Sequence, residues 1–200
     1  MFGKILIVIV LFITNVKLLA QNVAEESFNY KRCFLQHIRI VGETNLNQFT
    51  LFFHNTNSNY ISVKEKRTHG YYDEKLIEFR IPVEAFEGNN HLLVNDFRNL
   101  VDASNHPSII VEIEKKVFDY IYLSSFSSAL TFYLTIAGKK EYVQGEYKTN
   151  IRNNSVVLKG SAKIRLSDFS ITPPQKMFGM LQVKDVIIIK FDILIRGSNT

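Results

Sequence analysis

Apolar residues near the C-terminus alternate with other residues over a long stretch. In the phase from residue 183 to residue 195, every position except Asp185 is apolar. The apolar positions are Val183, Ile187, Ile189, Phe191, Ile193 and Ile195. The intervening phase is mixed, so this period of two predicts a long strand with one face against a core or cavity. Before it, Pro173-Pro174 and Gly179 predict a corner, and Ser167 or Asp168 is expected to cap a short helical turn there.

The same alternation recurs upstream in segments separated by turn residues. The predicted strands span residues 34–41, 47–54, 60–63, 72–83, 108–117, 127–137, 141–150 and 156–166. Turn chemistry separates several of them, at residues 42–45, 55–59 and 153–155. Together with the C-terminal strand these nine segments, some of them short, amount to about eight strands at hairpin-like spacing, which favours an antiparallel sheet large enough to curl and close.

One segment breaks the period of two. Apolar residues between residues 90 and 103 recur at spacings of three and four: Leu92, Leu93, Phe97, Leu100 and Val101. This spacing is typical of an amphipathic helix, and Asn105 and Pro107 mark its end. We therefore predict an all-β fold, an extended eight-stranded antiparallel β-barrel with one short inserted α-helix. A barrel of about eight strands is just wide enough to be filled by side chains or to hold one small ligand.

The length of the chain and its first residues indicate how many domains it has and whether it is exported. The 200 residues are 46% hydrophobic, which is enough for one sizeable core and too little for two ordinary domains. Lys4 precedes an unbroken apolar run at residues 5–13, and Ala20 offers a small residue before a cut, which predicts a signal peptide. The run is too short for a transmembrane anchor. We expect a signal peptide (1–20), an N-terminal entry segment (21–33) and a barrel domain (34–197) in a periplasmic or secreted protein.

The net charge and the single cysteine limit the kinds of partner molecule that we expect. The chain has a formal net charge of +5, and loss of Lys4 and Lys17 leaves 22 basic against 19 acidic residues, a net of +3. No basic stripe concentrates this surplus, so we expect no nucleic-acid partner. Cys33 is the only cysteine, and it is either a buried hydrophobe or a link to a second chain. The oligomeric state stays open, with a dimer as one option.

The candidate binding site consists of the apolar side chains that share one face of each predicted strand or helix. In a closed barrel these side chains line the lumen and leave little polar chemistry to hold a sugar, nucleotide or metal. The predicted lining is Phe49, Leu51, Phe53, Phe79, Ile81, Phe97, Ile109, Val111, Phe132, Leu134, Ile187, Ile189 and Phe191. The alternative is that these residues fill the barrel as an ordinary core and that the loops carry the function.

Other candidate chemistry is sparse. The histidines stand singly, without the spacing of zinc sites: His37, His54, His69, His91 and His106. The serines at residues 124–128 lack a nucleophile-elbow sequence, which disfavours a hydrolase. Asp96 and Arg98 either orient a ligand head group or are exposed helix charges. Asp185 either hydrogen-bonds a head group at the barrel mouth or lies beyond the rim.

Several short segments, in order, resemble the YceI-like family of exported lipid-binding-like proteins. They are residues 40–49 (IVGETNLNQF), 81–86 (IPVEAF), 95–98 (NDFR), 106–107 (HP), 134–138 (LTIAG), 167–169 (SDF), 173–174 (PP) and 179–184 (GMLQVK). Each is weak alone, and together they cover about residues 34–195. Residues 60–72 and 118–128 match no part of the family pattern.

The resemblance implies an extended lipocalin-like barrel whose apolar tunnel binds a long lipid, an isoprenoid or a similar amphiphile such as an isoprenoid quinone. It implies no catalysis and no cofactor other than the bound lipid. The expected partners are that lipid and, transiently, a membrane. The alternative function is that of an interaction or stress-related barrel protein with a packed interior.

Overall fold

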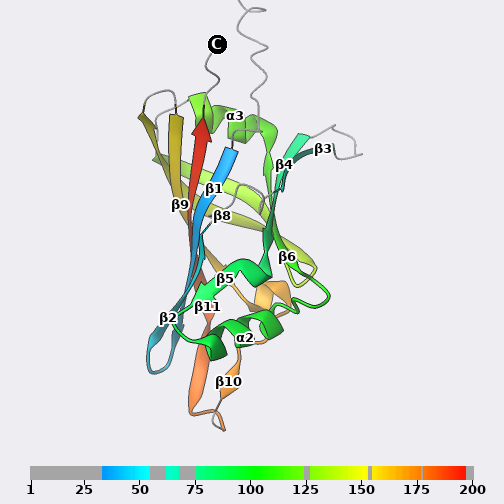
Figure 1. Cartoon of the computed structure of the whole chain (residues 1–200), viewed down its shortest axis with the longest axis vertical. Helices are drawn as coiled ribbons and strands as arrows, with labels where there is room; N and C mark the ends of the chain where they lie inside the picture. The colour runs from blue at the N-terminus through cyan, green and yellow to red at the C-terminus, as the bar shows by residue number, and fades with distance from the viewer. Residues whose placement is uncertain are drawn as a thin grey trace, which may run out of the picture.

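The computed structural model describes residues 33–54, 62–67, 75–123, 127–152, 155–176 and 178–196. These residues form a curled antiparallel sheet with a helix across each end (Figure 1). The strands are β1 (Cys33–Thr44), β2 (Gln48–His54), β3 (Ser62–Arg67), β4 (Lys75–Pro82), β5 (Phe86–Gly88), β6 (Ser108–Glu114), β7 (Ser127–Ile136), β8 (Lys139–Arg152), β9 (Ser155–Arg165), β10 (Gln175–Lys176) and β11 (Leu181–Arg196). The helices are α2 (His91–Leu100) and α3 (Lys115–Leu123), with 3-10 turns η2 (Val83–Ala85) and η3 (Ser167–Phe169).

The strands are linked in the order β3-β4-β6-β7-β8-β9-β11-β1-β2-β5, and β10 pairs with β11. Neighbouring strands are antiparallel. Of the eleven strands in the described part of the chain, eight have seven residues or more: β1, β2, β4, β6, β7, β8, β9 and β11. The predicted all-β, barrel-like antiparallel fold is confirmed. Short strands β3, β5 and β10 are additions to it.

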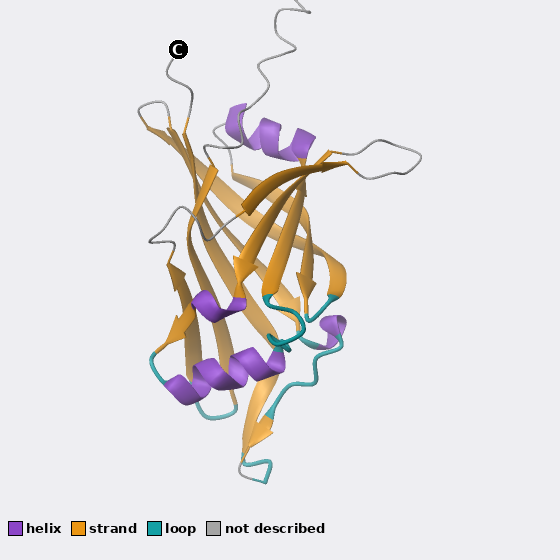
Figure 2. Cartoon of the chain, turned by 45° about the vertical axis from the view of Figure 1, so that its right-hand side comes forward, coloured by secondary structure: helices purple, strands orange, loops and turns teal. Residues whose placement is uncertain are grey.

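The chain that runs from β4 into β5 connects the two sides of the curled sheet. β4 pairs with β6 through Pro82. After η2 the chain changes partner, because β5 pairs with the opposite edge of the sheet and Phe86 faces Phe53 of β2. At the change of partner, the Val83 N–H donates to the Pro107 carbonyl oxygen at 2.9 Å. One continuous segment therefore connects β4, the neighbour of the edge strand β3, with β5 at the other edge of the curled sheet (Figure 2).

The helix α2 lies where the sequence predicts a helix. It begins after Asn90, whose Oδ1 accepts a hydrogen bond from the Leu92 N–H at 2.8 Å, a typical N-cap. Val94 and Phe97 are its buried residues. The helix thus lays its apolar face over one end of the barrel, which we call the α2 end (Figure 1).

The helix α3 is a correction to the prediction of a single helix. The strand expected over residues 108–117 ends at Glu114, and α3 begins at the next residue. Phe118 and Ile121 share one helical face and are 0% and 1% exposed. Burial of this face across the barrel end outweighs extension of the strand. We call this the α3 end of the barrel.

Buried side chains fill the α3 end. Ile77, Tyr147, Val156 and Ile195 belong to the same core cluster as Phe118. Phe118 and Phe79 lie with their ring centroids 6.1 Å apart. Val156 and Ile195 are direct partners on β9 and β11, near the end of β11. The barrel is therefore packed where α3 covers it.

Two local predictions differ from the structure. β1 does not break at Gly42 but continues to Thr44, because Gly42 and Glu43 pair with Phe49 and Gln48 of β2. Glycine is needed at residue 42 because a Cβ there would be 2.2 Å from Phe49 Cζ. The turn η3 has no side-chain cap. Its Ser167 hydroxyl instead donates to the Asp185 carboxylate at 2.7 Å. The predicted corner is present, and Gly179 adopts a φ of 86° in the turn between β10 and β11.

Some predictions fall outside the described residues. They are the signal peptide (1–20), nearly all of the entry segment (21–33), the turns at residues 55–59 and 153–154, and the state of the Cys33 side chain. These remain predictions, as does the division into domains. Within the described ranges, no helix combines the length and the hydrophobicity that crossing a membrane requires.

Candidate functional site

A cavity of about 590 Å³ occupies the barrel between its packed α3 end and the α2 end. Its walls are the inner faces of β1, β2, β4, β6, β7 and β11 together with α2. Leu181 and Ile193 of β11 both line it, and their separation along the strand corresponds to about 40 Å. The cavity is therefore long and narrow, and it follows the barrel axis.

The alternation along β11 explains why its side chains face a hollow. Val183, Ile187, Ile189 and Ile193 share the inward phase of the strand and line the cavity. Ile189 is only partly buried although it points inward. An inward side chain that keeps exposed surface borders empty space rather than a packed core.

The structure brings twelve of the thirteen predicted lining residues to the cavity wall. They are Phe49, Leu51, Phe79, Ile81, Phe97, Ile109, Val111, Phe132, Leu134, Ile187, Ile189 and Phe191. Phe53 lies outside the lining. It is fully buried against Phe86, its partner on β5, with 5.7 Å between ring centroids. The pairing of β5 with β2 fills the space next to Phe53. A role in lipid binding remains a prediction for all thirteen residues.

Sequence reasoning left out part of the wall. Ile38 and Ile40 of β1 and Leu93, Leu100 and Val101 around α2 also line the cavity. The signal for them was present, since they lie on the apolar faces of a predicted strand and a predicted helix. The apolar wall is completed by Leu35, Phe86, Leu92, Ile113, Leu130, Ile136, Leu166, Ile171, Pro174, Leu181, Val183 and Ile193.

The polar part of the lining is concentrated at the α2 end, which forms the mouth. It comes from the end of β1, the β1–β2 turn, the start of β2, the segment before α2, α2 and β10: Thr44, Asn47, Gln48, Thr50, Asn89, Asn90, Asp96 and Lys176. Amide and hydroxyl groups predominate in this set. They can donate and accept hydrogen bonds without carrying charge.

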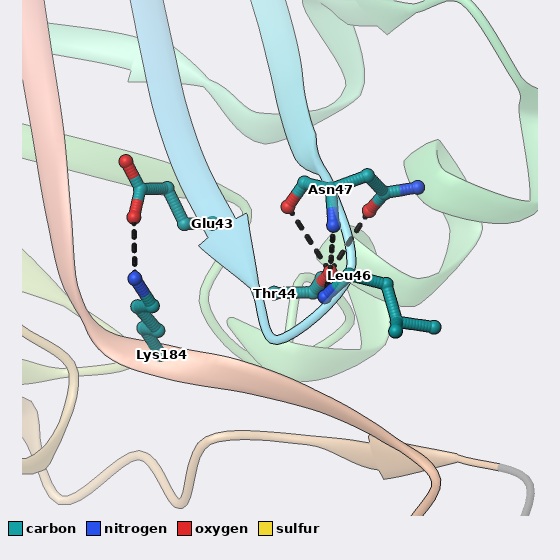
Figure 3. A network of polar contacts seen from close by, with 5 residues as sticks. All are labelled: Glu43, Thr44, Leu46, Asn47 and Lys184. Atoms are coloured by element: carbon teal, nitrogen blue, oxygen red, sulfur yellow. Dashed lines mark hydrogen bonds and ion pairs between the residues drawn. The ribbon is translucent and has the colours of Figure 1, made fainter.

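The β1–β2 turn at the mouth is held by Thr44 (Figure 3). Its one O–H has two acceptors within reach, the Asn47 carbonyl oxygen at 3.0 Å and Asn47 Oδ1 at 2.9 Å. It also accepts from the N–H groups of Leu46 and Asn47, at 3.1 and 2.9 Å. These local bonds fix the turn. Asn47 is thus held at the edge of the cavity.

Two ion pairs brace the mouth. Lys176 of β10 pairs with Asp96 of α2, and both residues line the cavity. Lys184 Nζ lies 2.7 Å from Glu43 Oε2 and joins β11 to β1 (Figure 3). The hydrogen bond and charge of Lys184 lower the pKa of Glu43. Asp96 therefore does lie at the mouth, as one of its two predicted roles required, and its carboxylate faces a lysine.

The other charged candidates serve the scaffold. Asp185 is not among the lining residues, and it accepts hydrogen bonds from the Ser167 N–H at 2.8 Å and the Ser167 hydroxyl at 2.7 Å. These two bonds lower the pKa of Asp185. Arg98 donates from Nη2 to the Glu84 carbonyl oxygen at 2.8 Å, which ties α2 to η2. Asp185 thus holds η3 against β11 instead of facing the lumen.

The described residues offer little catalytic chemistry inside the cavity. No group of three or more His, Cys, Asp or Glu side chains in these residues is placed to hold a metal ion. His37 and His54 meet with 2.9 Å between their Nδ1 atoms, but both are exposed and neither lines the cavity. The site as described can enclose an apolar chain and offer polar groups to its head.

The family model of the YceI-like domain matches residues 28–195 of the chain. The chain belongs to the YceI-like family. The resemblance found in the sequence motifs is therefore confirmed. A search of curated protein sequences found no match to this YceI-like chain.

Solved structures of low sequence identity share the YceI-like fold. BcnA from Burkholderia cenocepacia has a TM-score of 0.55 at 16% identity, over 84% of this chain and 99% of that one. A polyisoprenoid binding domain from Saccharophagus degradans, implicated in plant cell wall breakdown, has a TM-score of 0.58 at 11% identity, also over 84% and 99%. A mutant Campylobacter jejuni YceI protein with a monobromobimane guest has a TM-score of 0.52 at 14% identity, over 70% and 83%.

Proposed function

We propose that this protein is an exported, noncatalytic binding protein that holds a long apolar or amphiphilic lipid in its barrel for transport or storage. The observation that carries the proposal is the long apolar cavity with its polar groups gathered at one end. This distribution matches a molecule with a hydrocarbon tail and a small polar head. Membership of the YceI-like family supports the same conclusion.

The cavity volume suits a chain of moderate length. A cavity of about 150 Å³ lined by apolar side chains accommodates one benzene molecule. The volume of about 590 Å³ is roughly four times larger, which gives room for on the order of two dozen carbon atoms. Each methylene moved from water into such a lumen contributes about 0.8 kcal/mol. Ten buried carbons thus contribute about 8 kcal/mol before losses of chain and orientational freedom.

The class of lipid is proposed to be an isoprenoid or a similar amphiphile, an isoprenoid quinone included. A polyisoprenoid binding domain is among the proteins of this fold, and the apolar wall selects by length and shape rather than by hydrogen bonds. The predicted signal peptide supports a location in the periplasm or outside the cell. Transient contact with a membrane follows from the need to collect and deliver the lipid.

The test is to purify the protein from its host compartment without detergent and to analyse its organic extract by mass spectrometry. A lipid in stoichiometric amount is expected. Uptake of a fluorescent isoprenoid by the delipidated protein should be saturable. An empty extract together with no uptake would favour the alternative, a barrel protein that acts through its loops.

A pair of variants on β11 tests whether the lipid enters the cavity. Ile189→Phe adds volume on the inward phase, whereas Ile188→Phe adds the same kind of side chain on the other phase of the strand. Uptake should fall at least about tenfold only in Ile189→Phe, since overfilling an enclosed space is unfavourable. Phe132→Arg should abolish uptake while circular dichroism reports a folded barrel. Equal uptake by all three variants would place the lipid elsewhere.

A further inference from the structure

The most exposed large apolar side chains of the described residues gather at the cavity mouth. Phe178 is fully exposed, and Leu46, Leu92 and Met180 are 74%, 67% and 63% exposed. The other large apolar side chains exposed in the described ranges are less so, from 44% for Val186 to 58% for Tyr120. We call Leu46, Leu92, Phe178 and Met180 the apolar rim.

The rim residues come from three segments that surround one opening. Leu46 is in the β1–β2 turn, Leu92 is in the first turn of α2, and Phe178 and Met180 are in the β10–β11 turn. Figure 1 shows these three segments at the same end of the barrel, with the β10–β11 turn at its extreme. Leu92 also lines the cavity, so the rim is continuous with the apolar interior.

Polar contacts hold the three segments together. The Asn45 side chain donates from Nδ2 to the Met180 carbonyl oxygen at 2.8 Å and accepts from the Gln182 N–H at 3.0 Å. The ion pair of Asp96 and Lys176 joins α2 to β10. The rim residues thus project from a braced frame, and the Leu46 side chain points away from its turn (Figure 3).

Charges at the mouth occur in opposite pairs. Lys176 is paired with Asp96, and Lys184 is paired with Glu43. The local charge of these four groups therefore sums to zero. A surface of this kind has no reason to select an anionic membrane, and apolar contact must supply its attraction.

We propose that the apolar rim inserts into the interfacial region of a lipid bilayer, so that the mouth opens directly onto the membrane that supplies or receives the lipid. This inference rests on the proposed function of the cavity. Exposed apolar side chains around a polar-edged opening are typical of an interaction site rather than of ordinary surface. A bilayer is a suitable partner for the apolar rim because its side chains project separately, and each of them can enter the headgroup region independently. Docking also removes the step in which the bare lipid would cross water.

The first arm of the test is flotation of the purified protein with phosphatidylcholine vesicles on a density gradient. The protein should float, and binding should change less than about twofold between low and high salt. Phe178→Ser combined with Met180→Ser should lower the bound fraction at least about tenfold. Neither residue lines the cavity. Ile151→Ser is the matched control, because Ile151 is an exposed apolar residue near the end of β8 that pairs with Val156, toward the α3 end.

The second arm separates docking from lipid binding. A fluorescent isoprenoid presented from cyclodextrin should load the wild type and the double variant equally, whereas extraction from vesicles should be at least about tenfold slower in the double variant. If neither protein takes up the isoprenoid from cyclodextrin, the proposed function of the cavity is refuted. The flotation experiment would then still test whether the apolar rim binds a membrane.

Four outcomes would overturn the docking surface. One is a wild-type protein that stays unbound, and another is a double variant that floats like the wild type. The third is a wild-type dimer that the double variant converts to a monomer, which would assign the rim to contact between two copies. Binding that needs anionic lipid and disappears in salt would equally reject an apolar rim.

Discussion

The ring of Phe132 on β7 meets the ring of Phe191 on β11 edge to face, with 6.5 Å between centroids and 80° between planes. Two strands, β8 and β9, separate β7 from β11 in the sheet, so these rings approach each other through the barrel interior. Both residues line the cavity. The pair therefore sets the width of the lumen part-way along its length.

Replacing Phe191 by alanine should widen the lumen at this point. We expect bulkier ligands, such as branched or ring-bearing lipids, to gain affinity relative to straight chains. The free energy of unfolding should fall by about 1–3 kcal/mol, less than for a packed core phenylalanine, because this ring already borders a hollow. Competition between ligands of different width measures the first effect and urea denaturation the second. Phe52→Ala, on a ring that does not line the cavity, is the control and should leave the ligand preference unchanged.

Gly160 of β9 is predicted to tolerate no side chain. It pairs with Phe191, whose ring lies against it, and a Cβ at Gly160 would be 2.2 Å from Phe191 Cζ. Gly160→Ala should lower the free energy of unfolding by about 1–3 kcal/mol and displace the ring into the lumen. A double-mutant cycle with Phe191→Leu should recover part of that loss. Additive effects in the cycle would show that the ring is not the obstacle.

The ion pair of Lys176 and Asp96 is predicted to control exchange rather than stability. Lys176→Met should change the free energy of unfolding by less than about 1 kcal/mol, because partly exposed ion pairs contribute little. It should speed release of a bound fluorescent lipid, since α2 loses its contact with β10 at the mouth. Stopped-flow transfer to acceptor vesicles measures the rate. The exchanged pair Lys176→Asp with Asp96→Lys should restore slow release, and failure to do so would assign the effect to the lost side chain itself.

Asp185 should make stability depend on pH on the acid side. Hydrogen bonds from Ser167 lower its pKa in the folded protein, so its contribution is present above the unfolded pKa of about 4 and is lost as pH falls through the lower folded pKa. Asp185→Asn should therefore be destabilising at neutral pH and nearly neutral in acid. Urea denaturation at several pH values measures this difference. Ser167→Ala should remove much of the same pH dependence, and an undiminished dependence in that variant would point to another carboxylate.

The alternation of apolar residues along the predicted strands identified most of the residues that line the cavity. Ile187 and Ile189 reach the cavity because the inward phase of a two-residue period does not depend on which strands are neighbours. Phe53 lies on the apolar phase of β2, yet its side chain is packed and does not line the cavity. The reason is that β5 pairs with β2 and places Phe86 opposite Phe53. Only the tertiary arrangement distinguishes these two situations.

The ends of the barrel were harder to predict than its wall. The residues of α3 have apolar positions that fit a strand as well as a helix over such a short run, and the need to cover the barrel end decides between them. The polar mouth was missed for another reason. Asn47 and Lys176 are far apart in sequence, and nothing local indicates that both border one opening. Phe178 and Met180 look like ordinary turn residues until their exposure is known.

The packing of α3 against its end of the barrel has a directional consequence. In the described part of the chain the cavity reaches its polar edge at the α2 end, whereas α3 covers the other end. Under the proposed function an amphiphile would therefore enter tail first, and its head would stay at the asparagine and glutamine side chains of the α2 end. Phe118 and Ile121 of α3 are buried and do not belong to the cavity lining. The packed α3 end would then limit the length of the lipid tail that the cavity accepts. A lipid bound in this way would leave by the route through which it entered, so its loading and its unloading would occur at the same end and at different times.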